Sequence, residues 1–592
     1  MPDSNVEIQP PQDTSKAQIP LNLVRTISST SRRDVVNKAD IEKQLDLEKA
    51  GHAGDISGGS SSRTSQDGIE HQQDDDSRSK TIVSFSRNDP LNPYCWPFSK
   101  KLYVTLTGIL MVLNSTIGSS IATGASSQTS EHFNVTNQTQ LVLPTSMYLV
   151  GYVLGPLFFS PLSETYGRKI VMISTFILYT AFTLGCALAP SWAGLIVMRM
   201  LVGVGASTPV SVIGGIYSDI YGTPKARGRA MALFMGATTW GPILGPVFSG
   251  FIAVVSWRWV YWLQLIIAGV TWPVLLMVPE TYGPVVLKAK AKKMRKEGNG
   301  NAYAPVELEK RDMHELLVVI LTRPVRMFLF EGIVLCSCLY TALVYAIFYS
   351  MSVNVSRPDL KCLTSHLVFL QAYPIIFTGV YNFNAGEQGL AFLPIGIGSI
   401  ISCGIYLAWD AYLDRARTQD PPPKWYGKEE YRRVPLACLG APLLSISMFW
   451  LGWTAKASIH WIVPVLAAIP FGIAYLLIFM ALLNYLVDAY EIFSASAMAA
   501  ASCSRSLFAV ILPFAARPMY ERLGIAWACS LLGFVSLALG VIPFMFLKYG
   551  DKIRANSKFC RELAAKKMEQ EKATEARFAE EDARAMEEGK NA

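Results

Sequence analysis

Charged side chains are scarce in this sequence of 592 residues, of which only 17% are Asp, Glu, Lys or Arg. An ordinary soluble domain carries about 25%. The shortfall argues against a conventional soluble protein, because the 51% of hydrophobic residues come in runs of about 20, the length that crosses a bilayer core. The sequence therefore predicts a polytopic membrane protein.

Metal-ligand and catalytic patterns are also missing. The six histidines lie far apart, and the ten cysteines form no C-x-x-C pair. We therefore predict no metal site, no disulfide framework and no enzyme. No G-x-x-x-x-G-K-[ST] loop is present to bind ATP phosphates, so we expect no cofactor and an ion gradient as the energy source.

Hydropathy predicts an all-α fold of twelve transmembrane helices in two six-helix halves. The first six cover 102–124, 141–162, 170–188, 193–217, 230–254 and 259–278. The second six cover 327–349, 389–409, 435–453, 461–486, 493–516 and 525–546. The expected organisation is a disordered tail at 1–95, halves at 96–280 and 327–548, a central loop at 281–326 and a second tail at 549–592.

Basic residues gather in alternate connections between the apolar runs. They include Lys100, Lys101, Arg168, Lys169, Lys225, Arg227, Arg229 and the Lys- and Arg-rich run 288–296. Positively charged loops face the cytoplasm, so both termini and the central loop are expected there. This pattern sets membrane topology and does not indicate nucleic-acid binding.

Short motifs identify a family. Residues 160–169 read SPLSETYGRK, and residues 241–250 read GPILGPVFSG. Supporting segments are DPLNP at 89–93, WRW at 257–259, PETY at 279–282 and NYLVDAY at 484–490. The chain resembles the major facilitator superfamily in its fungal drug:proton antiporter form, and the resemblance extends over both halves.

The first motif implies a conformational latch formed by Glu164, Gly167, Arg168 and Lys169. Gly167 allows a tight turn, and Glu164 is placed to meet Arg168 or another base across the interface between the halves. The sequence departs from the superfamily pattern at three positions: Ser160 replaces a glycine, Glu164 an aspartate and Thr165 a basic residue. One charge of the usual latch is therefore missing.

The second motif resembles the antiporter signature, which separates exporters from many importers. Its residues are Gly241, Pro242, Gly245, Pro246 and Gly250. Gly241, Gly245 and Ser249 recur every fourth residue and form a flat face for a neighbouring helix, while the prolines provide bends. Generic small-residue packing explains the glycines but not the doubled Gly-Pro, so this motif favours efflux.

Arg199 lies inside the fourth span, where an uncompensated charge costs about 2.5–3.5 kcal/mol. The resemblance implies a role in proton coupling, and the alternative is a structural donor to neighbouring carbonyls. The carboxylates that are candidates for carrying the proton are Glu331, Glu387 and Asp488. Each is equally well explained as a boundary residue that faces water. Arg505 in the eleventh span also needs a partner, either Asp488 or a carbonyl.

The resemblance implies a central substrate cavity between the first, fourth, seventh and tenth spans. Candidate lining residues are Asn114, Tyr340, Tyr345, Tyr475 and Asn484. Such a cavity accepts amphipathic molecules through apolar contacts and a few hydrogen bonds. For any single tyrosine, an interfacial position is an equal alternative.

Glycosylation triplets begin at Asn134, Asn137 and Asn354, all outside in this topology. The family resemblance lapses between 350 and 368. That stretch is either an extended outer loop or a translated intron.

These observations predict proton-coupled efflux of small amphipathic organic molecules, such as drugs, fungicides, toxins or secondary metabolites. The expected partners are the substrate, protons and the lipid bilayer, with no nucleic acid, and we expect a monomer. The resemblance implies the plasma membrane as location. Two alternatives stay open: a transporter of polyamines or another small solute in either direction, and a membrane receptor without transport.

Overall fold

The computed structural model describes residues 81–568 with several gaps. These gaps are 86–88, 136, 298–300, 309–312, 353–372, 420–422, 424, 426–427, 429, 491–493, 558, 563–564 and 566–567. Most of the expected tail at 1–95, most of the insert at 350–368 with Asn354, and the end of the second tail lie outside the described residues.

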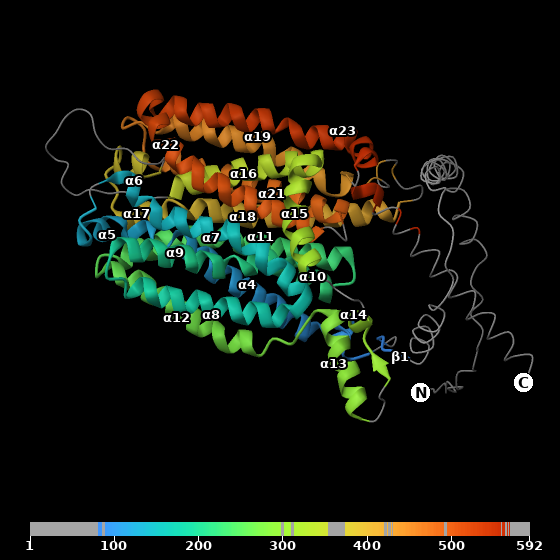
Figure 1. Cartoon of the computed structure of the whole chain (residues 1–592). Helices are drawn as coiled ribbons and strands as arrows, with labels where there is room; N and C mark the ends of the chain where they lie inside the picture. The colour runs from blue at the N-terminus through green and yellow to red at the C-terminus, as the bar shows by residue number, and fades with distance from the viewer. Residues whose placement is uncertain are drawn as a thin grey trace, which may run out of the picture. The chain divides into compact units, whose positions relative to one another are not determined.

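The described chain is almost entirely helical (Figure 1). The long helices of the first half are α4 (Phe98–Ser120), α7 (Leu143–Tyr166), α8 (Arg168–Ala187), α9 (Trp192–Ala206), α10 (Thr208–Ile220), α11 (Pro224–Ile252) and α12 (Trp257–Leu276). Those of the second half are α16 (Gly332–Ser352), α18 (Leu393–Arg417), α19 (Glu430–Thr454), α21 (Ala468–Tyr490), α22 (Ser494–Leu539) and α23 (Val541–Asn556).

Shorter elements complete the described chain. They are β1 (Thr81–Ile82), η1 (Pro93–Cys95), η2 (Thr123–Ala125), α5 (Ser126–His132), α6 (Gln138–Leu141), α13 (Gly283–Lys296), β2 (Ala302–Tyr303), α14 (Pro305–Leu308), α15 (Met313–Phe330), η3 (Pro374–Thr378), α17 (Ala385–Leu390) and α20 (Ile462–Leu466). Figure 1 places α13 and α14 at one end of the bundle and α5, α6 and α17 at the other. We call these the α13 end and the α5 end.

Twelve helical segments of the described chain are long and apolar enough to cross a membrane, which confirms the predicted number. Some spans combine two elements: α9 and α10 form one, and α17 and α18 another. Gly524, with a φ of 74°, breaks α22, so the eleventh and twelfth spans meet inside that helix. Glycine adopts this left-handed conformation without a steric cost.

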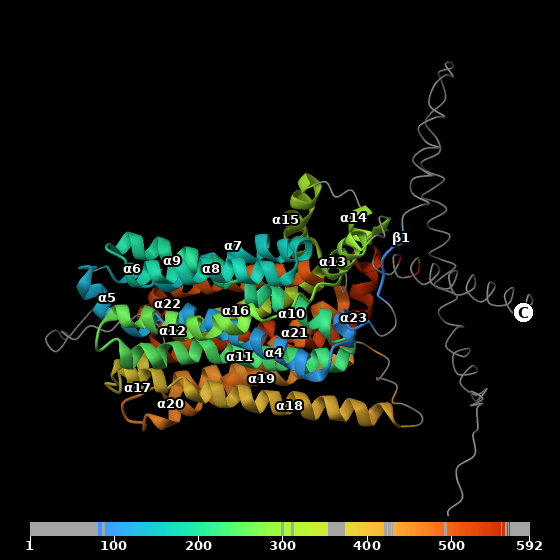
Figure 2. The same ribbon diagram turned by 90° about the horizontal axis from the view of Figure 1, so that it is seen from below.

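Two sets of helix contacts make up most of the interface between the halves. In one, α11 packs against α17 and α18, and in the other α7 packs against α22. Within the halves, α4 packs on α11, α7 on α9, α16 on α22 and α19 on α21. Figure 2 shows α4, α11 and α18 running alongside one another. Interfaces between the halves therefore run through the middle of the bundle.

Close contact between α7 and α9 depends on two glycines. A Cβ atom on Gly203 would collide with the main-chain oxygen of Tyr148, and one on Gly151 with that of Met200. Small residues let membrane helices approach closely because lipid tails are as apolar as the side chains, so packing must supply the attraction. This contact fixes α9, which carries Arg199.

The stretch predicted as a central loop contains α13, β2, α14 and α15. β1 pairs with β2 in parallel, and the Asp89 carboxylate lies 2.6 Å from the Lys290 amine on α13. Part of the expected N-terminal tail is thus ordered, because its backbone and one acid bind the central segment. Arg295 makes two hydrogen bonds to Glu307 and holds the pKa of that carboxyl below its usual value. This pair therefore stabilises the segment at neutral pH and loses that contribution as the pH falls through the lowered pKa.

We expect Gly203→Val to destabilise the bundle by about 1–3 kcal/mol, the usual cost of overpacking. The measurement is the midpoint of thermal unfolding in detergent, followed by size exclusion. Gly269→Val is the matched control, because Gly269 is exposed on α12 and no atom lies within 4 Å of an added Cβ. Equal midpoints for the two variants would show that the α7–α9 contact does not require the glycine.

Candidate functional site

Arg199 is completely buried on α9 and is surrounded by main-chain oxygens. Its guanidinium donates to Pro144 at 3.0 Å, Gly118 at 2.9 Å and Ser119 at 3.5 Å. The ring of Tyr148 lies 4.6 Å away and adds a cation–π contact. The geometry therefore has the carbonyl contacts of the structural alternative, and proton coupling by Arg199 stays a prediction.

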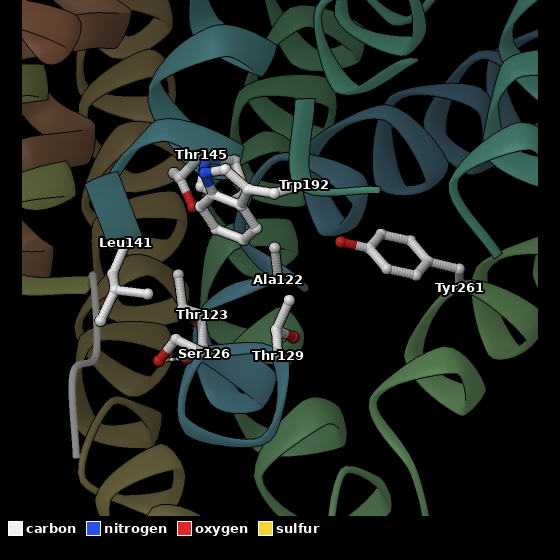
Figure 3. A pocket seen from close by; sticks show the side chains of 9 residues that line it. Ala122, Thr123, Ser126, Thr129, Leu141, Thr145, Trp192 and Tyr261 are labelled. Carbon is white, nitrogen blue, oxygen red and sulfur yellow. Dashed lines mark hydrogen bonds between the residues drawn. The ribbon is translucent and has the colours of Figure 1, made fainter. Parts of the chain in front are cut away.

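A small polar cavity lies beside Arg199 at the α5 end (Figure 3). Its lining includes Thr123, Ser126, Thr129, Pro144 and Tyr261. The Tyr261 hydroxyl points toward the turn after α4. The main-chain oxygen of Pro144 accepts from Arg199. The cavity volume of about 10 Å³ holds about one water molecule. Space for one water molecule thus lies beside Pro144, whose main-chain oxygen accepts from the buried cation.

A hydrogen bond joins the halves in the middle of the bundle. The Ser119 hydroxyl on α4 lies 2.7 Å from the Tyr349 hydroxyl on α16. The Tyr349 ring lies 4.7 Å from that of Tyr345. The guanidinium of Arg505 lies 5.7 Å from the Tyr345 ring. Contacts thus run from Arg199 in one half to Arg505 in the other.

Arg505 is 6% exposed on α22, and the structure distinguishes its two expected partners. Its Nε donates to the Ala501 main-chain oxygen at 3.1 Å, and its guanidinium lies over the Phe479 ring at 5.3 Å. Asp488 pairs instead with Arg227 and Arg433. The carbonyl alternative therefore describes Arg505.

Two of the five candidate cavity residues lie together at the interface. Tyr475 stacks on Phe479 at 4.5 Å, and the Tyr345 ring lies 6.2 Å from Phe479. Of these rings, Tyr475 and Phe479 line a cavity whose walls come from both halves. Its residues are Val210, Phe234, Met235, Thr238 and Thr239 from the first half, and Tyr475, Leu476, Phe479, Met498 and Arg505 from the second.

The remaining candidates for the cavity have other surroundings. The Asn114 amide donates to Thr271 on α12 at 2.6 Å, inside the first half. Tyr340 is completely buried, and its hydroxyl has no hydrogen-bond partner in the described part of the chain. Asn484 is buried further along α21. The sequence pattern did not single out Ser119, Tyr349 or Phe479, since serine and aromatic residues are common in membrane helices.

The residues of the first motif form a charged cluster at the turn between α7 and α8. Arg168 lies 3.9 Å from the Glu164 carboxylate and 3.3 Å from that of Asp219 on α10. The Glu280 carboxylate accepts from the main-chain N–H groups of Arg168 and Lys169, which caps α8. Gly167 has a φ of 104°, and an added Cβ would lie 2.6 Å from Glu280. These contacts fall within the first half.

A second set of ion pairs crosses between the halves. The start of α11 provides three bases, and α18 and α21 provide the acids. The pairs are Lys225 with Asp414, Arg229 with Asp410 at 3.0 Å, and Arg227 with Asp488 at 3.3 Å. Arg433 also bonds Asp488, at 3.0 Å. These contacts hold the halves together at one end, and Asp488 is part of them.

The sequence contained a signal for these pairs. Lys225 and Arg229 are four residues apart, and so are Asp410 and Asp414. Residues at this spacing lie on one face of a helix. Two such faces of opposite charge match when the helices are antiparallel, but the sequence does not say which helices are neighbours.

The other two candidate carboxylates differ from Asp488. Glu331, between α15 and α16, is 4% exposed and accepts from the Tyr490 hydroxyl at 3.0 Å. No cation lies within ion-pair distance of it among the described residues. Glu387 is exposed and forms a capping box with Asn384 at the start of α17. Glu331 is therefore the buried acid of the three without a charged partner in the described chain.

The small residues of the α11 motif lie on two interfaces. Cβ atoms added to Gly241 and Gly245 would collide with Thr116 and Ser120 of α4. One added to Gly250 would lie 2.8 Å from the carbonyl carbon of Ala385, in the second half. Pro242 and Pro246 lie inside the helix. The motif thus allows α11 to touch α4 and α17 together.

The two described glycosylation candidates lie near the α5 end. Asn134, with a φ of 52°, follows α5, and Asn137 precedes α6. Metal-binding groups of three or more His, Cys, Asp or Glu are absent from the described residues. The nine cysteines of that part of the chain are free thiols.

Known proteins resemble this chain in sequence and in fold. The Major Facilitator Superfamily matches residues 107–513. Efflux pump FUB11 of Gibberella moniliformis is 36% identical over 488 residues, which is 81% of this chain and 78% of the relative. The major facilitator superfamily multidrug transporter mdrA of Aspergillus fumigatus is 34% identical over 486 residues, 81% of this chain and 75% of that protein.

Solved structures agree in fold. The proton:xylose symporter XylE superposes with a TM-score of 0.52 at 16% identity, over 76% of this chain and 97% of that one. The human organic anion transporter MFSD10 gives a TM-score of 0.51 at 16% identity, over 76% and 100%. At this identity the likeness shows the fold alone.

We expect Asp488→Asn to weaken the closure between the halves by roughly 3 kcal/mol, because it leaves the buried Arg433 and the half-buried Arg227 without their acid. Thr223 and Thr418 flank the paired parts of α11 and α18. Spin labels at these two positions, in a variant whose native cysteines are replaced, give the distance between the helices by double electron–electron resonance. The mean distance should lengthen or its distribution broaden. Glu297→Gln is the control, since it removes an exposed pair within α13. An unchanged distribution in Asp488→Asn would contradict the assignment.

Proposed function

This chain belongs to the Major Facilitator Superfamily, and we propose that it exports small amphipathic organic molecules across the plasma membrane in exchange for protons. The observation that carries the proposal is its similarity to fungal efflux pumps over four-fifths of its length. The placement of the α11 glycines against both α4 and α17 supports it.

Export requires a cavity that opens to one side of the membrane at a time. The aromatic cavity between the halves is suited to this, because its walls come from both. Ion pairs between the start of α11 and the helices α18 and α21 close one end. We assign this end to the cytoplasm, since the basic connections lie there and positively charged loops stay inside. The halves then rock about the cavity, and these pairs break when it opens inward.

The carboxylate best placed to carry the proton is Glu331. Proton transport needs an acid that is not held in an ion pair, and Glu331 is buried with no base within ion-pair distance among the described residues. The Tyr490 hydroxyl at the end of α21 bonds to it, which links its protonation to a helix of the central cavity. Asp488 is less suited, because it is held in ion pairs with Arg227 and Arg433.

Accumulation of fluorescent and radiolabelled compounds tests the proposal in cells that lack their own pumps. We expect the protein to lower accumulation severalfold, and a protonophore to abolish the difference, because it dissipates the proton gradient. Raised accumulation would reverse the direction of transport. A protonophore-insensitive decrease would remove proton coupling while leaving efflux in place.

Glu331→Gln tests the proton carrier separately. The variant cannot ionise but keeps the shape of the side chain and an oxygen that accepts from Tyr490. We expect it to lose active efflux, by at least about tenfold in initial rate, while substrate still binds. Glu387→Gln is the matched control, since that acid caps a short exposed helix. Normal pumping by Glu331→Gln in everted vesicles would exclude Glu331 as the carrier.

A further inference from the structure

The middle of the membrane region is positively charged. Every Asp and Glu in the twelve candidate spans lies near one end of its span, where water or ion pairs are within reach. Among the buried bases of the described spans, Arg199 and Arg505 are the two with no acid within ion-pair distance, since Arg168 pairs with Asp219 and Arg433 with Asp488. A charge in this position is costly unless a partner compensates it. The unpaired fixed charges in the interior of the described spans are therefore positive, and they favour an anion as partner.

Arg199 and Arg505 differ in the number of oxygens that accept hydrogen bonds from their guanidinium groups. Arg199 donates to three main-chain oxygens from three residues of neighbouring helices. Arg505 donates to one oxygen, from Ala501 of its own helix, although a guanidinium has five N–H donors. Its guanidinium also lies against the faces of Tyr345 and Phe479. Arg505 thus keeps donors for a further acceptor.

The place where those donors lie is the cavity between the halves. Arg505 is the charged residue among the ten that line it. Thr238 and Thr239 of α11 line the cavity from the first half, and the stacked rings of Tyr475 and Phe479 line it from the second. In this conformation the space of about 10 Å³ holds about one water, so a substrate enters when the halves separate.

We propose that the transported molecules are aromatic organic anions, with a carboxylate or similar group that pairs with Arg505 and a ring that lies against Tyr475 and Phe479. The inference rests on the proposed export and names its substrate class. A planar guanidinium matches a carboxylate through two parallel hydrogen bonds. Polyamines are disfavoured, because a cation in this cavity meets Arg505 with no acid among the lining residues.

Binding to the purified protein tests the charge preference without any assumption about direction. Three probes share one ring: naphthalene-2-carboxylate, naphthalene-2-carboxamide and 2-naphthylmethylammonium. Titration of the thermal-unfolding midpoint gives an apparent affinity for each. We expect the carboxylate to bind at least about tenfold more tightly than the amide, or 1.4 kcal/mol, and the ammonium compound to bind most weakly.

Variants of Arg505 test the assignment. Arg505→Gln should remove the preference for the carboxylate, and Arg505→Lys should retain part of it, since lysine keeps the charge but loses the planar pairing. Arg522→Gln is the control, because Arg522 is an exposed base at the start of the twelfth span. Arg505→Lys also serves if Arg505→Gln does not fold. Tighter binding of the ammonium probe, or a carboxylate preference that survives Arg505→Gln, would overturn the proposal.

Efflux of the same probes separates this inference from the proposed function. A carboxylate that binds but is not exported contradicts export and leaves the substrate class intact. Export of the ammonium probe without the carboxylate contradicts the substrate class and leaves export intact. Export of the carboxylate that is lost in Arg505→Gln supports both.

Discussion

An ionised arginine inside a bilayer must be surrounded by acceptors, and the arrangement of the first half follows from this constraint. Arg199 on α9 bonds to Gly118 and Ser119 of α4 and to Pro144 of α7. Three helices thereby converge on one charge. The glycines Gly151 and Gly203 bring α7 and α9 close enough for this contact. Ser119 then extends the arrangement to the second half, through its hydroxyl and that of Tyr349.

Because an unpaired charge is costly inside a membrane, charged residues have one function at the ends of the bundle and another in its middle. Acids and bases pair at the ends, where water screens them, and the pairs between α11 and the helices α18 and α21 can exchange for hydration when the halves move. In the middle no such exchange is available. A guanidinium there is held by carbonyls and aromatic faces, as for Arg199, or keeps donors for a ligand, as for Arg505.

Much of the fold could be predicted because its cause is local. Runs of about 20 apolar residues must form helices in lipid, since the backbone has no other way to bond internally. Gly167 and the α11 glycines could be predicted as sites of tight turns and close packing, because a missing side chain has a direct steric meaning. The candidate site was predicted less completely. Tyr345 and Tyr475 both lie beside Phe479 at the interface, but Asn114 bonds within the first half. Adjacent residues of a helix face different neighbouring helices, and the sequence does not say which residue faces which helix.

The sequence by itself determined the number of spans, the family and the residues whose charge or lack of a side chain constrains the fold. Tertiary structure alone decided which partners those residues take. Asp488 bonds Arg227 and Arg433, while Arg505 bonds the Ala501 carbonyl. The physical reason is that pairing depends on helix neighbours and on rotation about each helix axis. Those are set by packing between segments far apart in the chain, which periodicity within one segment does not encode.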